Sequence, residues 1–397
     1  MTSRFIALED IADISAGNPA PQDAADFSED GQPFVRMQDV GREHHTRTLT
    51  HTADKLTADA VRRNRLRLYP AGTLLIPKSG ASINLNHRAL LARDAYVVSH
   101  LATVVPDTSR VDADYLYFWS LTYDPRSQAQ TTSLPSLPTS LIKSARIPLP
   151  PLSEQRRVVD LLSRAEGIVR LRREAQRKAA ELVPALFLEM FGDPASNPKG
   201  WQMYRIDELL ERFEGGKNLQ AGDDESATYR ILKISAVTSG RYIESESKPA
   251  PNDLIPAQSH FVRTGDLLIS RANTEALVGA TAIVDRTDGR TLLPDKLWRF
   301  VWRSDTAIEP KFALHLFQQP AIRNKLSQLA SGTGGSMKNI SQAKLKTLEL
   351  PVPPIELQRQ FAAKADAVRG IAAQQAAALA TAQATFDALL HQSFAVS

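Results

Sequence analysis

The residues best suited to chemistry in this sequence lie in four short polar segments. Lysine and arginine neutralise phosphates, while asparagine, serine, threonine and bare backbone amides donate to phosphate or read base edges. The segments are PKSGASINLNHR (77–88), TTSLPSLPTS (131–140), SRANTEALVG (270–279) and SGTGGSMKNIS (331–341). The candidate DNA-contacting residues in them are Lys78, Ser79, Asn84, Asn86, Arg88, Ser136, Thr139, Arg271, Asn273, Thr274, Thr333, Ser336, Lys338 and Asn339.

Each of these segments, taken alone, is better explained as an ordinary solvated turn. Their recurrence after equivalent strand patterns in both halves of the chain favours a shared contact role. A further basic stretch, VRRNRLRLYP (61–70), is better explained as a solvated helix face.

Signatures of catalysis and metal binding are missing from the sequence. There is no cysteine, and the eight histidines are scattered, with only His44 and His45 adjacent. No P-loop, dinucleotide-binding loop, GxSxG elbow, HExxH pair or Asn-Pro-Pro-aromatic tetrapeptide occurs. The sequence therefore predicts a binding protein that is not an enzyme, with no metal site and no cofactor of its own.

The composition is typical of a globular protein, and its charge permits a polyanionic partner without requiring one. The 397 residues are 43% hydrophobic and 23% charged, with a net charge of +4 and a pI near 9.2. The N-terminus lacks a signal-peptide pattern, and no apolar run approaches 18 residues. We expect a soluble, cytoplasmic protein with no membrane contact.

The sequence contains an internal repeat that covers most of its length. PLPPLSEQRR (148–157) returns as PVPPIELQRQ (351–360), a separation of 203 residues (351 − 148). Upstream of these proline hinges, LEDIADISAGN (8–18) matches IDELLERFEGG (206–216), and AGTLLIPKSG (71–80) matches TGDLLISRAN (264–273). FVRMQDV (34–40) and ILKISAV (231–237) are matching strand candidates, and 111–121 and 308–317 are matching aromatic-rich helices. The spacing drifts from 193 to 203 residues, which indicates diverged copies of one unit.

A long helix is expected after each hinge. Apolar residues recur with 3-4 spacing at Val158, Leu161, Ala165, Ile168, Ala175, Ala179, Leu182 and Leu186. The second helix carries Phe361, Val368, Ile371, Leu379, Ala382, Phe386 and Leu389, with many alanines. Helices of this length are typical of coiled coils, and small residues allow close approach, so we expect the two to pair antiparallel. The alternative is that each helix packs on its own domain.

The predicted fold class is α/β (α+β), with two pseudo-symmetric globular domains separated by two long antiparallel helices. The expected boundaries are 1–147 for the first recognition domain and 148–192 for its hinge and central helix. Residues 193–350 form the second recognition domain, and 351–397 its hinge and C-terminal helix.

Taken together, the hinges, the repeat, GTLLI/GDLLI and GGSMKNISQAKLKTLELPVPP resemble the specificity subunit of type I restriction–modification enzymes over the whole chain. The resemblance implies that each globular domain is a target recognition domain reading one half of a bipartite, asymmetric DNA sequence. The helices would form a coiled coil that sets the gap between half-sites. The expected docking and coiled-coil residues are Gln155, Arg156, Leu161, Ile168, Leu182, Gln358, Arg359, Val368, Ile371 and Phe386.

The same resemblance implies partners. These are double-stranded DNA, two modification (methyltransferase) subunits that bring S-adenosylmethionine, and two restriction (helicase–nuclease) subunits that use ATP and Mg²⁺. Two departures stand out: Leu357 replaces Glu154 at the second hinge, and SLPSLPTS (133–140) replaces the glycine-rich segment of the second half. The alternatives are a self-contained DNA methyltransferase or nuclease, and a scaffold that binds only proteins.

Overall fold

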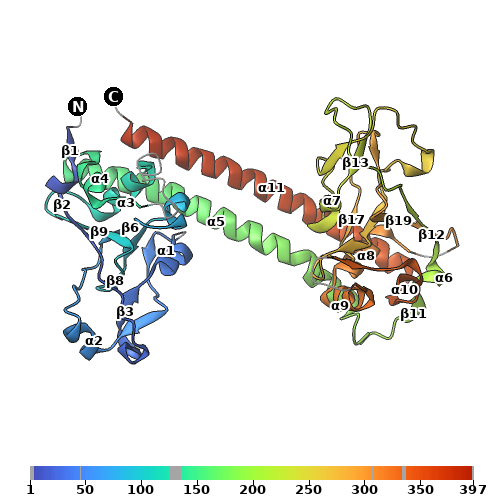
Figure 1. The fold of residues 1–397 in the computed structure, drawn as a ribbon, viewed down its shortest axis with the longest axis horizontal. Helices are drawn as coiled ribbons and strands as arrows, with labels where there is room; N and C mark the ends of the chain where they lie inside the picture. Colours follow the sequence, from blue (N-terminus) through green and yellow to red (C-terminus); the bar gives the residue numbers. More distant parts are fainter. Residues whose placement is uncertain (1–3, 45, 125–135, 306–307, 333–336, 396–397) are drawn as a thin grey trace. The chain divides into compact units, whose positions relative to one another are not determined.

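The computed structural model describes residues 4–44, 46–124, 136–305, 308–332 and 337–395 (Figure 1). The chain divides into two compact units: unit 1 is residues 1–176 with 375–397, and unit 2 is residues 177–374. The division runs through both long helices, α5 (Leu152–Phe191) and α11 (Ile355–Phe394). Each unit is therefore a globular head with half of each helix.

The head of unit 1 is built on a five-stranded sheet in the order β2-β9-β6-β7-β4 and a three-stranded sheet in the order β5-β3-β8. A short antiparallel pair, β1-β10, closes the head beside the hinge. The strands are β1 (Phe5–Ala7), β2 (Ala12–Ala16), β3 (Phe27–Val35), β4 (Thr48–Leu49), β5 (Asp54–Leu56), β6 (Leu74–Pro77), β7 (Ala89–Leu91), β8 (Tyr96–Val97), β9 (Leu101–Pro106) and β10 (Arg146–Pro148). The helices are α1 (Met37–Glu43), α2 (Ala58–Arg63), α3 (Ala113–Thr122) and α4 (Thr139–Ser144).

The head of unit 2 repeats this plan. Its main sheet runs β12-β19-β15-β17, its second sheet β14-β13-β18, and β11-β21 closes it beside the hinge. The strands are β11 (Gln202–Arg205), β12 (Leu210–Gly215), β13 (Arg230–Leu232), β14 (Ser247–Pro249), β15 (Leu267–Ser270), β16 (Ala272–Asn273), β17 (Thr281–Ile283), β18 (Thr291–Leu292), β19 (Leu297–Trp302), β20 (Lys338–Asn339) and β21 (Glu349–Val352). The helices are α6 (Ile206–Leu209), α7 (Ser235–Thr238), α8 (Pro310–Gln318), α9 (Pro320–Leu329) and α10 (Gln342–Lys346).

The strand orders confirm the duplication, because β2-β9-β6-β7 and β12-β19-β15-β17 correspond strand for strand. One expectation is wrong in part. FVRMQDV and ILKISAV were expected as whole strands, but the strands end at Val35 and Leu232 and short helices follow. In the first copy, the Asp39 carboxylate accepts the Arg36 N–H at 2.8 Å, which caps the new helix at its start.

A buried glutamine fixes each hinge. The Gln155 carbonyl accepts the Asp112 N–H at 2.8 Å, and its amide donates to the carbonyls of Pro150 and Arg110, both at 2.9 Å. In the second copy, Gln358 accepts the Glu309 N–H at 2.9 Å and donates to the Pro353 carbonyl at 2.7 Å. Both glutamines are fully buried. Their observed role is to join the start of each long helix to the cap of α3 or α8.

Both helix starts carry an acid, although Leu357 replaces Glu154 in the second hinge. Glu154 lies in the first turn of α5, and Glu356 lies in the first turn of α11. A carboxylate there interacts favourably with the positive end of the helix dipole. The second hinge thus keeps the acid, at the position that corresponds to Ser153.

The long helices run antiparallel within each unit. In unit 1, Leu162 and Val169 of α5 share a core with Phe386, Leu390 and Phe394 of α11. In unit 2 the other halves meet, and the rings of Phe187 and Phe361 lie 5.5 Å apart. Both cores also contain residues of the heads, including α3 and α8. Helix pairing and packing on the heads, which the sequence left as alternatives, therefore occur together.

Part of the predicted seam of α5 is confirmed, since Ala179 is buried and Val158, Ala165 and Leu186 pack against the cores, but three predicted residues lie one position away from it. Leu162, Val169 and Val183 are buried, whereas Leu161, Ile168 and Leu182 are 46%, 53% and 48% exposed. In α11, Phe386 is buried as expected and Val368 is partly buried, but Ile371 is 49% exposed. Arg156 and Arg359 are also exposed. Leu161, Ile168 and Leu182 therefore form an outer stripe of α5, and Leu162, Val169 and Val183 face inward.

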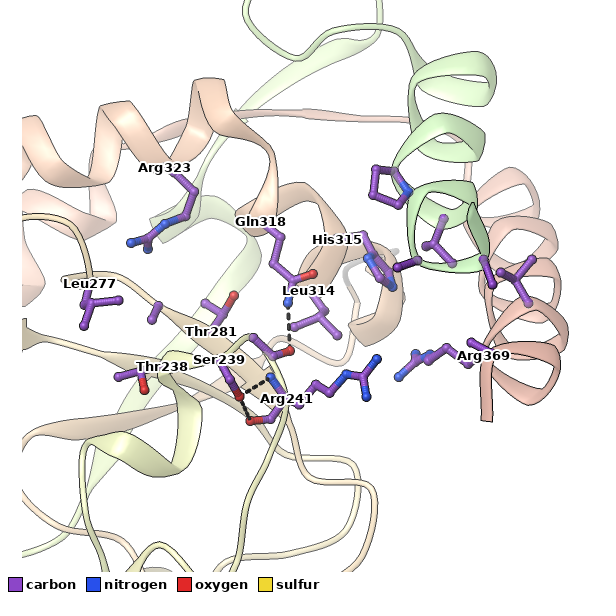
Figure 2. Close-up of a pocket in the computed structure, with 18 of the residues that line it drawn as sticks. Thr238, Ser239, Arg241, Leu277, Thr281, Leu314, His315, Gln318, Arg323 and Arg369 are labelled. Carbon is purple, nitrogen blue, oxygen red and sulfur yellow. Dashed lines mark hydrogen bonds between the residues drawn. The ribbon is translucent and has the colours of Figure 1, made fainter. Parts of the chain in front are cut away.

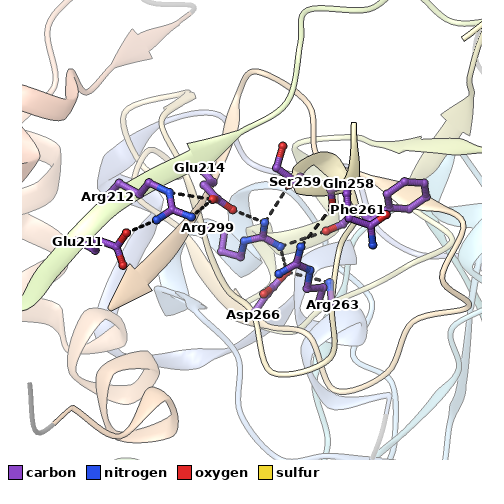
Figure 3. Close-up of polar contacts among 9 residues, drawn as sticks. All are labelled: Glu211, Arg212, Glu214, Gln258, Ser259, Phe261, Arg263, Asp266 and Arg299. Carbon is purple, nitrogen blue, oxygen red and sulfur yellow. Dashed lines mark hydrogen bonds and ion pairs between the residues drawn. The ribbon is translucent and has the colours of Figure 1, made fainter. Parts of the chain in front are cut away.

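An ion network secures the main sheet of unit 2 (Figure 3). Arg299 on β19 is 4% exposed and donates to Asp266 at 2.8 Å and to Glu214 on β12. It also donates to the carbonyls of Ser259 and Phe261, at 2.8 and 3.0 Å. Burial raises the pKa of Asp266. Burial also acts to raise the pKa of Glu214, but the hydrogen bonds and charges of Arg299 and Arg212 outweigh it, and the pKa of Glu214 is lowered. Such a network fixes strand pairing by leaving no buried charge without a partner.

Among the helices of the described residues, none is both long enough and apolar enough to cross a membrane.

Candidate nucleic-acid interface

Each head brings its two predicted polar segments side by side. In unit 2, β16 from the first segment pairs antiparallel with β20 from the second, with Asn273 opposite Lys338 and Ala272 opposite Asn339. In unit 1, Ser79 and Ser136 form the corresponding antiparallel bridge. Segments more than 50 residues apart in the sequence thus form one continuous surface in each head.

The same backbone hydrogen bonds build both surfaces. Lys78 directly follows β6; its N–H donates to the His100 carbonyl at 3.1 Å, and its carbonyl accepts the Leu137 N–H at 2.8 Å. Arg271 directly follows β15, and its N–H donates to the Lys296 carbonyl at 3.1 Å. The Arg271 carbonyl accepts the Ile340 N–H at 2.8 Å. Lys78 and Arg271 are therefore equivalent positions of the repeat.

Several predicted residues present polar groups at these surfaces. Asn84, Thr274 and Asn339 are exposed. The partly exposed members are Lys78, Ser79, Asn86, Ser136, Thr139, Asn273 and Lys338. Asn84 belongs to a short 3-10 helix, Ala81–Leu85, that follows Gly80, whose φ of 71° is open to glycine without steric cost. Thr333 and Ser336 lie outside the described residues.

Arg88 differs from the expectation of an exposed loop residue. It is only 2% exposed and donates to the carbonyls of His87 and Tyr123, at 2.8 and 3.3 Å, and to Asn86 Oδ1 at 2.6 Å. Burial lowers the pKa of its guanidinium to about 10. Arg88 joins the loop to the end of α3, and we do not carry it into the interface.

Arg271 is held in place while remaining partly exposed. Its guanidinium donates to the Asp295 carbonyl at 2.7 Å and to the Asp295 carboxylate at 3.0 Å, and it lies over the Trp298 ring at 5.6 Å. A guanidinium fixed in this way is preorganised, but its charge is shared with Asp295. Lys338, on the adjacent strand, is a second cation of this surface.

Two residues at the surfaces were missed by the sequence reasoning. His100 accepts the Lys78 N–H through its carbonyl, and its Nδ1 lies 2.7 Å from Ser79 Oγ. Lys296 occupies the same place in unit 2. The signal was present: both are polar residues directly before the buried strands β9 and β19, and extending the repeat alignment would have matched them.

Among the described residues, no group of three or more acidic or histidine side chains is arranged to hold a metal ion. The two surfaces offer hydrogen-bond donors, acceptors and positive charge, a combination suited to contacts with phosphates and base edges.

Comparison with known proteins bears on this arrangement. Residues 2–180 and 198–375 each match the family model described as type I restriction modification DNA specificity domain. The type I restriction enzyme EcoEI specificity subunit of Escherichia coli is 30% identical over 168 residues, which are 42% of this chain and 28% of that protein. The MjaVIII specificity subunit of Methanocaldococcus jannaschii is 22% identical over 285 residues, 67% of this chain and 66% of the relative. These matches span less than two thirds of the relatives' own lengths.

Solved structures share the fold. The type I restriction-modification S subunit from M. genitalium superposes with a TM-score of 0.55 at 12% identity, covering 99% of both chains. A chain from a structure on complex assembly and conformational transition of the type I R-M system gives a TM-score of 0.62 at 19% identity, covering 99% of this chain and 97% of the other. With the family domain matched twice over most of its length, this chain belongs to the type I restriction-modification DNA specificity family.

Proposed function

We propose that this chain is the DNA-specificity subunit of a type I restriction–modification complex and reads a bipartite, asymmetric DNA sequence, one half-site per head. The observation that supports this most is the repeated surface, in which Lys78 and Arg271 follow equivalent strands and make the same backbone hydrogen bonds. Two such surfaces in one chain suit a target made of two unlike halves. The side chains on them differ, so the half-sites should differ too.

The chain itself should catalyse nothing. Two modification subunits would bring S-adenosylmethionine, and two restriction subunits would bring ATP and Mg²⁺ chemistry. We expect the purified chain to show no methyl transfer to DNA and no cleavage, and adenine methylation to begin when the modification subunit is added. Methyl transfer by the isolated chain would instead support the alternative of a self-contained enzyme, and a failure to bind DNA in any complex would support a protein scaffold.

The proposed docking surface for modification subunits is the exposed apolar face of α5 formed by Leu161 and Ile168 of the outer stripe together with the neighbouring Leu171. Leu161, Ile168 and Leu171 are 46%, 53% and 59% exposed and recur at spacings of seven and three, so they share one face of the helix. Exposed leucine and isoleucine in a row are unusual on a surface without a partner. Arg156 and Arg359, exposed at the two helix starts, remain candidates for the same contact.

A pair of variants tests this docking surface. Ile168→Glu should release the modification subunit in a sizing experiment while the chain itself remains folded, because Ile168 contributes little to the core. Arg170→Glu is the matched control: Arg170 is exposed and lies nine residues, or two and a half turns, from Leu161, on the opposite face. Full retention of the complex by Ile168→Glu would contradict docking on this stripe.

A further inference from the structure

Unit 2 contains a cavity to which the proposed DNA-binding function assigns no role (Figure 2). Its volume is about 430 Å³, within the range of roughly 300–1,000 Å³ typical of small-molecule sites. Residues of α5, α8, α9 and α11, of the end of α7 and the turn after it, and of the 276–281 segment, where the predicted polar segment 270–279 ends, line it. Its apolar wall includes Val183, Leu277, Leu314 and Val368.

Buried hydrogen-bonding groups without a partner are concentrated in this cavity. Among the described residues, Arg369 Nε and Nη2, Arg323 Nη1, Thr281 Oγ1 and His315 Nε2 are buried and make no hydrogen bond. Thr281 is only 2% exposed. Arginine nitrogens can only donate, and a hydroxyl readily does so. Unmet buried donors are costly, so the cavity is suited to a ligand rich in acceptors.

The lining is also positively charged. Arg241, Arg323 and Arg369 line the cavity, and among the described residues no aspartate or glutamate does. The carboxylates nearest to Arg369 are those of Asp366 and Asp285, at 3.5 and 3.8 Å. Asp366 is shared with Lys311, so Arg369 and Lys311 are balanced by Asp366 and Asp285, and the excess positive charge of the lining comes from Arg241 and Arg323.

Hydrogen bonds fix the turn that carries Arg241 and the guanidinium of Arg323 before any ligand arrives. Gln318 Nε2 donates to the Gly240 carbonyl at 2.9 Å, which fixes the turn that carries Arg241. Arg323 Nη2 donates to the Ala276 carbonyl at 3.0 Å and leaves Nη1 directed elsewhere. In Figure 2 the side chains of Arg241 and Arg369 extend toward one another, with His315 close by, while Arg323 and Leu277 lie farther off. Preorganised donors lower the cost of binding.

We propose that this cavity binds a small organic molecule carrying an oxyanion, a phosphate or carboxylate group, held between Arg241 and Arg369. Thr281 and Arg323 would donate to its other polar atoms, and the apolar wall would cover its organic part. Paired guanidinium groups suit an oxyanion because each forms two parallel charge-assisted hydrogen bonds. We expect ligand binding at this site to occur in the absence of DNA.

Calorimetric titration of the full chain tests the proposal, with phenyl phosphate, benzoate and inorganic phosphate as probes. Phenyl phosphate or benzoate should bind saturably at one site per chain, and whichever is tighter identifies the preferred oxyanion. Inorganic phosphate should bind more weakly than phenyl phosphate, because it leaves the apolar wall uncovered.

Variants locate the binding. Arg241→Met and Arg369→Met should each weaken binding at least tenfold, since each removes charge-assisted hydrogen bonds. Arg241 is exposed and contacts Ser239 only through its backbone, so this variant should keep the wild-type melting temperature. Arg286→Met, at an exposed arginine that does not line the cavity, is the control and should bind as wild type.

Three outcomes would overturn the proposal. One is the absence of saturable binding by both phenyl phosphate and benzoate. The second is equal affinity of wild type and Arg241→Met for these probes. Third, if Arg241→Met and Arg369→Met weakened only the binding of duplex DNA, the arginines would serve DNA phosphates and the small-molecule site would be wrong.

Discussion

At the scale of single residues, one buried glutamine in each copy joins a long helix to its head. Removing the buried Gln155 amide would leave the Asp112 N–H and the carbonyls of Pro150 and Arg110, in a partly buried site, without these partners. We predict that Gln155→Leu lowers the free energy of unfolding by about 2–4 kcal/mol in urea denaturation. The neighbouring Arg156→Leu, at an exposed position, should change it by less than about 0.5 kcal/mol. Equal effects of the two substitutions would contradict the assigned role.

His315 gives the stability of unit 2 a defined dependence on pH. Burial and the charge of Arg369 lower the pKa of His315 to about 4, below its ordinary value of 6.5. The unfolded chain therefore binds the proton more tightly, so the stability contributed by neutral His315 is present above pH 6.5 and lost as pH falls toward 4.

We predict that His315→Asn reduces the loss of unfolding free energy between pH 6.5 and 4, relative to wild type. The exposed His391→Asn is the control and should keep the wild-type slope, because the side chain of His391 lies at the surface. Denaturation curves at several pH values measure both. A wild-type slope in His315→Asn would mean that His315 is not held neutral.

Residue chemistry in the sequence predicted which segments meet but not how each side chain is used. The basic and amide-rich segments do lie side by side: the first of each pair follows β6 or β15, and the second, which comes after α3 or α9 in the chain, pairs with it. Arg88 has the same residue type as Arg271 but turns inward, because the carbonyls of His87 and Tyr123 accept its donors. Such a choice depends on neighbours 35 residues away, which no local pattern reports.

At the scale of elements, α5 carries two apolar stripes, and the sequence alone does not tell which one is the seam. Leu161, Ile168 and Leu182 form one heptad, and Leu162, Val169 and Val183 form the other. The exposed heptad has larger apolar side chains at a more regular spacing, so the sequence pattern favoured it as the seam with α11. The buried one was decided by tertiary contacts with the aromatic side chains of α11, such as Phe386.

These stripes should respond differently to truncation. We predict that Leu162→Ala costs about 2–5 kcal/mol of unfolding free energy, because Leu162 is fully buried between α11 and the head. Leu161→Ala, one residue earlier and 46% exposed, should cost less than about 1 kcal/mol. The two variants have the same composition, so the comparison isolates burial. A larger loss of unfolding free energy in Leu161→Ala than in Leu162→Ala would support the seam predicted from the sequence.

At the scale of the whole molecule, the proposed function makes the helices a spacer between half-sites. Arg172 Nη1 donates to Gln375 Oε1 at 3.2 Å, which identifies paired positions in α5 and α11. Duplicating residues 173–176 and 371–374 together would lengthen both helices by ~6 Å and turn them by about 40°. A base-pair step advances ~3.4 Å.

We therefore predict that this double insertion enlarges the unspecified gap of the target by one or two base pairs and leaves both half-sequences unchanged. Inserting four residues in α5 alone is the control, and it should impair assembly because the seam with α11 is shifted. Sequencing of methylated sites measures the gap. An unchanged gap in the double insertion would mean that the helices do not set the spacing.

The claim that each head reads one half-site is tested most directly by mapping methylated adenines in cells that carry the modification subunit with wild-type or variant chains. Lys78→Ala with Asn84→Ala should relax or abolish one half of the target only. Lys338→Ala with Asn339→Ala should affect only the other half, and each lost base contact should cost ~1–3 kcal/mol of discrimination. Loss of both half-sequences together in either double variant, with the chain still folded and assembled, would contradict the account.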